Sequence, residues 1–332
     1  MIFQPAIIAL LLASGLGVAM LAAATPFAIE IIRRWNLASG SELQLRLERR
    51  TYLFSTLVTF VLAIQLLALL LFVFNADRMS VMFVGAMCAV GTLNADAYGF
   101  PALLAQIGTF FLATTWLAIN HVDSRARDYP LVKLKYGLLI GLLPALLAVA
   151  ALEWLYFSNL NADVITSCCG SLFSSDAKGI SSDLAALPPG PALIAFYGSL
   201  GAACAGCGWY GRYRRGGYLV ALFSTLAFAA AISGVLSFVS LYVYENPHHH
   251  CPFCLLKPEY DWQGYGLYIP LFVATGAGIA VGALQPFRGI SSLAQIVPTY
   301  AARLAIVAAW GFALFAIIAT WMIWSSRLIL FE

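Results

Sequence analysis

Residues 218–243 read YLVALFSTLAFAAAISGVLSFVSLYV and contain no Asp, Glu, Lys or Arg. A helix needs about 20 consecutive apolar residues to cross the hydrocarbon core of a bilayer, so this stretch predicts a membrane-spanning helix. The composition of the 332-residue chain agrees, because 62% of its residues are hydrophobic and 10% are charged. Soluble domains carry roughly 25% charged residues. The main solvent of this chain is therefore lipid.

Seven further segments meet the same length criterion, and the connections between segments are short. The eight expected spans are 6–29, 52–74, 101–120, 136–157, 190–211, 218–243, 264–284 and 304–326. The sequence thus predicts an all-α fold, a polytopic bundle of about eight transmembrane helices in a single integral membrane domain over 1–332. A shorter apolar run within 79–100 breaks into a polar, Gly-containing stretch. We expect a short interfacial or re-entrant helix near 79–93, because this run is too short to span.

The distribution of basic residues predicts the orientation of the chain. No basic residue precedes the first apolar segment, whereas Arg33 and Arg34 follow it. With both termini outside, 14 of the 18 Lys and Arg residues fall on the inner side, as the positive-inside rule favours. We therefore expect a multi-pass protein of the cell inner membrane. The loops 75–100, 158–189 and 244–263 would form one extracytoplasmic cap.

Side chains that carry chemistry gather in these outer loops. Residues 246–254 read NPHHHCPFC and hold three of the four histidines together with a Cys-x-x-Cys pair. An oxidising outer compartment allows thiols to form disulfides. Five cysteines are expected on this side, so one is left over unless it pairs between chains or binds a metal. The candidate site residues are Cys88, Cys168, Cys169, Cys251 and Cys254, with His248, His249 and His250.

The order Cys251-Pro252-Phe253-Cys254 resembles the redox motif of glutaredoxins. In that motif the first Cys lies at a helix N-terminus, whose partial positive charge stabilises the thiolate. The resemblance implies that Cys251 is the attacking thiolate and Cys254 its resolving partner. The thioredoxin fold itself is not implied, because residues 218–243 are expected to span the membrane.

The leading interpretation is a membrane thiol–disulfide redox protein. Its logic resembles that of the bacterial membrane oxidoreductases that pass electrons between outer thiols and a quinone. Cys168 or Cys169 would form the exchanging pair with Cys88, and the three histidines would tune the thiolate or relay protons. A periplasmic thiol or redox protein would be the partner. Gln65 and Gln106, inside the second and third spans, are candidates to line a quinone pocket or to hydrogen-bond neighbouring helices.

Two other functions stay open at this point. Clustered His and Cys are ligands for zinc and copper(I), which favours a soft-metal binding or transport protein that uses His248, His249, His250, Cys251 and Cys254. The chain could also be a non-catalytic membrane subunit of a larger complex, for example a respiratory one, whose outer cluster docks a partner protein. The cysteines could equally form structural disulfides that only brace the outer loops. Nucleotide and nucleic-acid functions are excluded, because the sequence has no Gly-rich phosphate loop and no basic tract with interleaved aromatics.

Overall fold

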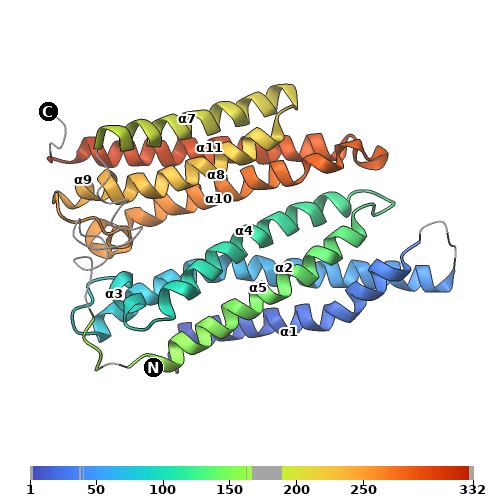
Figure 1. The fold of residues 1–332 in the computed structure, drawn as a ribbon, viewed down its shortest axis with the longest axis horizontal. Helices are drawn as coiled ribbons and strands as arrows, with labels where there is room; N and C mark the ends of the chain where they lie inside the picture. The colour runs from blue at the N-terminus through green and yellow to red at the C-terminus, as the bar shows by residue number, and fades with distance from the viewer. Residues whose placement is uncertain (1–2, 37–38, 40, 162, 167–188, 329–332) are drawn as a thin grey trace. The chain divides into compact units, whose positions relative to one another are not determined.

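The computed structural model describes residues 3–36, 39, 41–161, 163–166 and 189–328 (Figure 1). The chain divides into two compact units, each assembled from three segments. The N-terminal unit comprises Met1–Asn75, Asp96–Leu160 and Ala283–Tyr300. The C-terminal unit comprises Ala76–Ala95, Asn161–Gly282 and Ala301–Glu332.

Eight helices in the described part of the chain are long and apolar enough to cross a membrane. No strand occurs among the described residues, so the all-α polytopic bundle predicted from the sequence is confirmed. Each predicted span corresponds to one helix or continuous helical stretch. These are α1 (Pro5–Arg34), α2 (Glu42–Met79), α4 (Gly99–Asp123), α5 (Val132–Asn159), α7 (Pro189–Tyr213), α8 (Gly217–Gly234) continued by Val235–Val239 and α9 (Ser240–Tyr244), α10 (Gln263–Ala283) and α11 (Ile296–Ser325).

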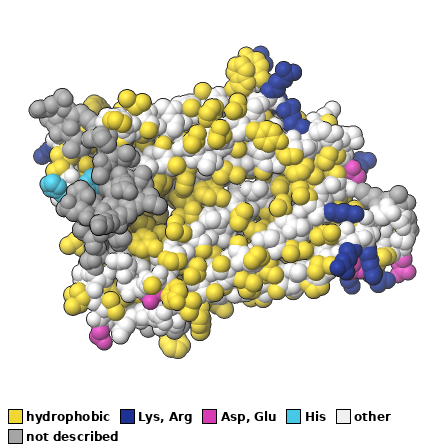
Figure 2. Space-filling model, in the orientation of Figure 1, with side chains coloured by type: hydrophobic (Ala, Val, Ile, Leu, Met, Phe, Trp, Pro, Cys, Tyr) yellow, Lys and Arg dark blue, Asp and Glu magenta, His cyan; other side chains and the backbone are white. Residues whose placement is uncertain are grey.

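The long helices expose large apolar side chains. Phe60, Leu67 and Trp310 are each at least 65% exposed, and hydrophobic side chains cover much of the visible helix surface (Figure 2). Soluble monomers rarely expose contiguous apolar patches larger than a few hundred Å². Together with the lengths of the helices, this surface identifies a multi-pass membrane protein.

The N-terminal unit is built around α5, which packs against α1 and α4. Phe27 of α1 lies at the centre of the core, with its ring centroid 4.6 Å from that of Phe54 and 5.5 Å from that of Tyr136. The helix α1 ends where the N–H of Trp35 is donated to the carbonyl of Ile31. Arg33 and Arg34 in its last turn complement the negative end of the helix dipole.

A buried ion pair fixes the turn between α4 and α5. The Nζ of Lys135 lies 2.8 Å from Oδ2 of Asp123, and both side chains have no exposed surface. Lys135 also donates to Oδ1 of Asn120 at 3.2 Å. The other carboxylate oxygen of Asp123 accepts the N–H of Leu131 at 2.8 Å. The indole N–H of Trp116 is donated to the carbonyl of Lys135, which adds a further contact between α4 and α5.

Glycines set the close packing of the C-terminal unit. A Cβ on Gly278 of α10 would lie 2.0 Å from Oγ of Ser224 on α8, and a Cβ on Gly311 of α11 would lie 2.9 Å from the carbonyl oxygen of Pro270. Only residues without a side chain allow helices to approach this closely. Where α8 gives way to α9, residues Val235–Val239 form a π-helical turn. Such turns are rare and often occur at functional sites.

The segment that was expected to lie at the membrane surface forms two short elements. Ser80–Met82 is a 3₁₀ turn, and Ala89–Asn94 is the six-residue helix α3. Five of the six residues of α3 are buried, so this helix is part of the C-terminal unit rather than an isolated surface helix. Its placement relative to a bilayer, as an interfacial or a re-entrant element, stays a prediction.

Candidate thiol cluster

Cys88 is positioned by a tight turn and a parallel bridge. Gly85 has a φ of 87°, in the left-handed region that favours glycine. A Cβ at Gly85 would lie 2.2 Å from the carbonyl oxygen of Thr166. Thr166 holds this segment in place, because its N–H is donated to the carbonyl of Val84 and its hydroxyl to the carbonyl of Gly91. Cys88 therefore enters the N-cap position of α3 from a fixed backbone.

Two tyrosines hold the backbone of the Cys-x-x-Cys loop. The hydroxyl of Tyr244, at the end of α9, is donated to the carbonyl of Cys251 at 2.6 Å. The hydroxyl of Tyr268, on α10, is donated to the carbonyl of Pro252 at 2.7 Å. These bonds satisfy carbonyls that lie outside regular secondary structure. The loop is therefore anchored at both of its flanking helices.

No α-helix starts at Cys251, contrary to the expectation from the glutaredoxin resemblance. The residues after it form the 3₁₀ turn Cys254–Leu256, followed by a second turn at Pro258–Tyr260. The α-helix α10 begins only at Gln263. Positive φ values at Asp261 and Trp262 redirect the chain before that point. A helix dipole at Cys251 is therefore absent.

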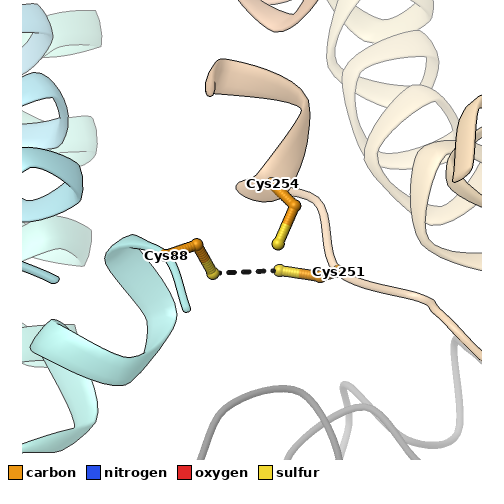
Figure 3. Close-up of side chains that lie close together, drawn as sticks. All are labelled: Cys88, Cys251 and Cys254. Carbon is orange, nitrogen blue, oxygen red and sulfur yellow. Dashed lines mark hydrogen bonds between the residues drawn. The ribbon is translucent and has the colours of Figure 1, made fainter. Parts of the chain in front are cut away.

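The sulfurs of Cys88, Cys251 and Cys254 converge (Figure 3). Sγ of Cys88 lies 3.5 Å from Sγ of Cys251, and all three sulfurs lie within 4.8 Å of one another. Cys88 and Cys251 have 0% exposed surface and Cys254 has 4%. In the described part of the chain, this is the one group of three or more potential metal ligands at such distances.

The three neighbouring histidines lie outside this group of three sulfurs. Nδ1 of His250 lies 2.8 Å from the carbonyl oxygen of Leu236, in the π-helical turn, and therefore donates its proton there. The ring of His249 packs on Tyr244 at a centroid distance of 4.2 Å, and burial lowers the pKa of His249. His248 is exposed. His250 thus braces the loop, while His249 stays neutral more readily than a solvated imidazole.

The remaining predicted site residues are two cysteines and two glutamines. Cys168 and Cys169 fall outside the described residues. Gln65 donates from Nε2 to the carbonyl of Ala13 at 2.8 Å, and Gln106 donates from Nε2 to Oε1 of Glu153. Both glutamines of the N-terminal unit therefore make hydrogen bonds between helices, which was the alternative to a quinone pocket.

Asp77 is a candidate functional residue that the sequence reasoning missed. It lies in the last turn of α2 and is 6% exposed. Its carboxylate is within electrostatic reach of Cys88 and Lys257. The sequence signal that could have identified it is a single carboxylate just after the apolar run 52–74, followed by Arg78. Because its charge acts on Cys88, this group is a candidate proton acceptor for that thiol.

Comparison with known proteins adds no assignment. The chain matches no protein-family model, no curated protein and no solved structure. The site must therefore be interpreted from its own geometry and chemistry.

Proposed function

We propose that this chain is a membrane thiol–disulfide redox protein whose reaction centre contains Cys88, Cys251 and Cys254. The observation that supports this most directly is the 3.5 Å separation of the sulfurs of Cys88 and Cys251, with Cys254 in the same cluster. Reacting atoms held about 3–3.5 Å apart are near the geometry of attack. Three sulfurs within reach are also the minimum for intramolecular exchange, since one attacks, one is attacked and one leaves.

The exchange step is balanced within the cluster. With Cys251 and Cys254 joined as a disulfide, the Cys88 thiolate attacks Sγ of Cys251. A Cys88–Cys251 bond forms, the Cys251–Cys254 bond breaks, and Cys254 leaves as a thiolate that takes up a proton. Asp77 can take the proton that Cys88 loses on becoming a thiolate. No external oxidant is needed for this step, because the number of disulfides is unchanged.

Turnover requires partners on either side of this step. A dithiol substrate would reduce the cluster disulfide by giving up two electrons and two protons, and would leave as a disulfide. A membrane quinone is the proposed acceptor, which would become a quinol as the cluster disulfide re-forms. In the orientation predicted from the basic residues, the cluster would lie on the extracytoplasmic side of the inner membrane, where disulfides form and persist.

Thiol trapping of variants in which one cysteine is replaced tests this proposal. Cys254→Ser should accumulate a Cys88–Cys251 disulfide, and Cys88→Ser should retain only a Cys251–Cys254 disulfide. Both products are identified by mass spectrometry of linked peptides after acid quenching. Cys204→Ser is the matched control, because its sulfur contacts the carbonyl of Ala309 on α11 instead of another described sulfur. The proposal fails if the cluster stays in one oxidation state under both dithiothreitol and an oxidised quinone analogue.

A soft-metal site is the second candidate, and the burial of the same three sulfurs favours it. Zinc–sulfur bonds of about 2.3 Å in a tetrahedron place sulfurs about 3.8 Å apart, a spacing that the cluster can accommodate. Three thiolates would also suit copper(I). The metal site predicts stoichiometric zinc or copper by elemental analysis, and thiols that react with maleimide only after a chelator is added. Metal-free protein that still exchanges disulfides would exclude it.

A further inference from the structure

A buried carboxyl in the N-terminal unit lies within the membrane-spanning part of the chain and plays no part in the thiol cluster. Glu153 of α5 is 1% exposed, and Gln106 of α4 is 4% exposed. Nε2 of Gln106 donates to Oε1 of Glu153. The side chain of Ser14, on α1, is close enough to act on Glu153, while its hydroxyl donates to the carbonyl of Leu10 at 3.1 Å. Three helices therefore bring together one carboxyl and two uncharged polar side chains.

Two oxygens of the Glu153–Gln106 pair have no hydrogen-bond partner, Oε2 of Glu153 and Oε1 of Gln106. An ionised carboxyl would leave both as buried acceptors. A polar group buried without a hydrogen bond is destabilising, and an unpaired buried charge is far more so. A proton on Oε2 solves both problems, because the carboxylic acid can then donate to Oε1 of Gln106 while Oε1 of Glu153 accepts the amide N–H. Acid and amide would form a pair with two parallel hydrogen bonds.

The alternative rotamer of the amide leads to the same requirement. If the carboxamide of Gln106 is turned over, its oxygen faces the carboxyl oxygen of Glu153. Two acceptors can share a hydrogen-bonding contact only when a proton lies between them. In either orientation of the amide, the hydrogen bonding between Gln106 of α4 and Glu153 of α5 is satisfied only when Glu153 carries a proton.

Among the described residues, no opposite charge acts on Glu153 to stabilise its ionised form. The groups that act on it are the uncharged side chains of Ser14 and Gln106, and Gln65 of α2 is bonded to a carbonyl of α1. Tyr156, one turn along α5, is the nearest titratable residue in sequence. Asp96 acts electrostatically on Tyr156 but does not act on Glu153.

Charges elsewhere on the packed helices are remote along their axes. With a helix rise of about 1.5 Å per residue, Lys135 is about 27 Å from Glu153 along α5. By the same rise, Glu30 is about 24 Å from Ser14 along α1. Asp123, on α4, is about 25 Å from Gln106. Within the described part of these helices, a bound proton is therefore the nearby positive charge that can neutralise the carboxyl.

We propose that Glu153 and Gln106 form a proton-binding site within the membrane-spanning helices of the N-terminal unit. Glu153 holds the proton as a neutral carboxylic acid, and Gln106 completes the pair. Loss of the proton breaks one of the two bonds between α4 and α5 and leaves a charge among apolar helices. Proton binding is thereby coupled to the packing of these two helices. This inference is independent of the proposed thiol chemistry.

Infrared spectroscopy of the full-length protein in detergent tests the site directly. At neutral pH the wild type should show a carbonyl band of a protonated carboxylic acid, which shifts in deuterium oxide and is lost in Glu153→Gln. The amide introduced by this substitution can still form two hydrogen bonds with Gln106, so the variant should fold. Glu30→Gln is the matched control, because Glu30 is partly exposed and pairs with Arg34, and the band should persist in it.

A second variant tests the role of Gln106. Gln106→Leu removes the acceptor for the acidic proton, so the carbonyl band should move to a different frequency while remaining dependent on Glu153. Identical neutral-pH spectra for wild type and Glu153→Gln would overturn the proposal, since Glu153 would then be ionised. An unchanged band in Gln106→Leu would also overturn the pairing, because the proton would have another acceptor.

Discussion

Removing the carboxylate of Asp123 should strongly destabilise the N-terminal unit. Asp123→Ala deletes the counter-charge of Lys135, which lies 2.8 Å away with both side chains fully buried. Breaking one partner of a buried ion pair costs about 3–5 kcal/mol. The variant also removes the acceptor for the N–H of Leu131, and an unsatisfied buried donor costs about 1–3 kcal/mol. The two losses together predict a decrease of at least about 4 kcal/mol in the free energy of unfolding.

The double variant Asp123→Ala/Lys135→Met separates the two contributions. It leaves no buried charge, so it should recover the part of the free energy of unfolding that is lost with the ion pair. The part lost with the Leu131 hydrogen bond should not be recovered. Unfolding by denaturant in detergent micelles, followed by circular dichroism, measures all three free energies. Glu42→Ala is the control, because Glu42 pairs with Arg46 on the exposed surface and such pairs contribute little. A stabilising ion pair is refuted if Asp123→Ala is as stable as the wild type, or if the double variant is less stable than the single one.

Three further perturbations test the cysteine-bearing segments. Gly264→Ala should lower the free energy of unfolding by about 1–3 kcal/mol through overpacking, because its Cβ would lie 2.9 Å from the backbone of the loop after Cys254. The same shift should alter the maleimide reactivity of the thiol cluster. Gly266→Ala, whose nearest contact is 3.9 Å away, should change neither quantity. Gly85→Ala should lower the melting temperature more than Gly216→Ala. Both positions have positive φ, but a Cβ at Gly85 would also lie 2.2 Å from a carbonyl oxygen. Equal decreases in melting temperature would show that backbone strain alone matters. Burial lowers the pKa of His249, so the folded state takes up its proton less readily than the unfolded state. Acidification through the range below about 6.5 should therefore reduce the melting temperature of the wild type more than that of His249→Phe, and parallel pH profiles would contradict this assignment.

The spans could be predicted from sequence because the length and polarity of an apolar run are local properties. A run such as 218–243 must satisfy its backbone hydrogen bonds internally in lipid, and a helix does so without any partner. The ends of the helices were less predictable. The helix α2 begins at Glu42, ahead of the apolar run predicted to start at residue 52, because polar residues outside the hydrocarbon continue the same helix.

Adjacency in sequence was a poor guide to the membership of the thiol cluster. His250 directly precedes Cys251, yet its ring turns to the carbonyl of Leu236. The resemblance to a redox motif predicted a helix at Cys251, but the turn that follows is a short 3₁₀ turn. Tyr244 and Tyr268 bond the backbone carbonyls just before that turn. These contacts come from helices on both sides of the loop, and a motif of a few residues carries no information about them.

The sequence by itself determined that this chain is a bundle of membrane-spanning helices, and it singled out cysteines and histidines as candidate site residues. Only the tertiary structure decided that Cys88 meets Cys251 across 163 positions of the chain, and that Gln106 meets Glu153 across 47. Apolar length is sufficient to form a helix in lipid, because each helix satisfies its own backbone. Which polar side chains meet depends on how the helices and loops pack, and that packing depends on glycines, ion pairs and hydrogen bonds contributed by many distant residues.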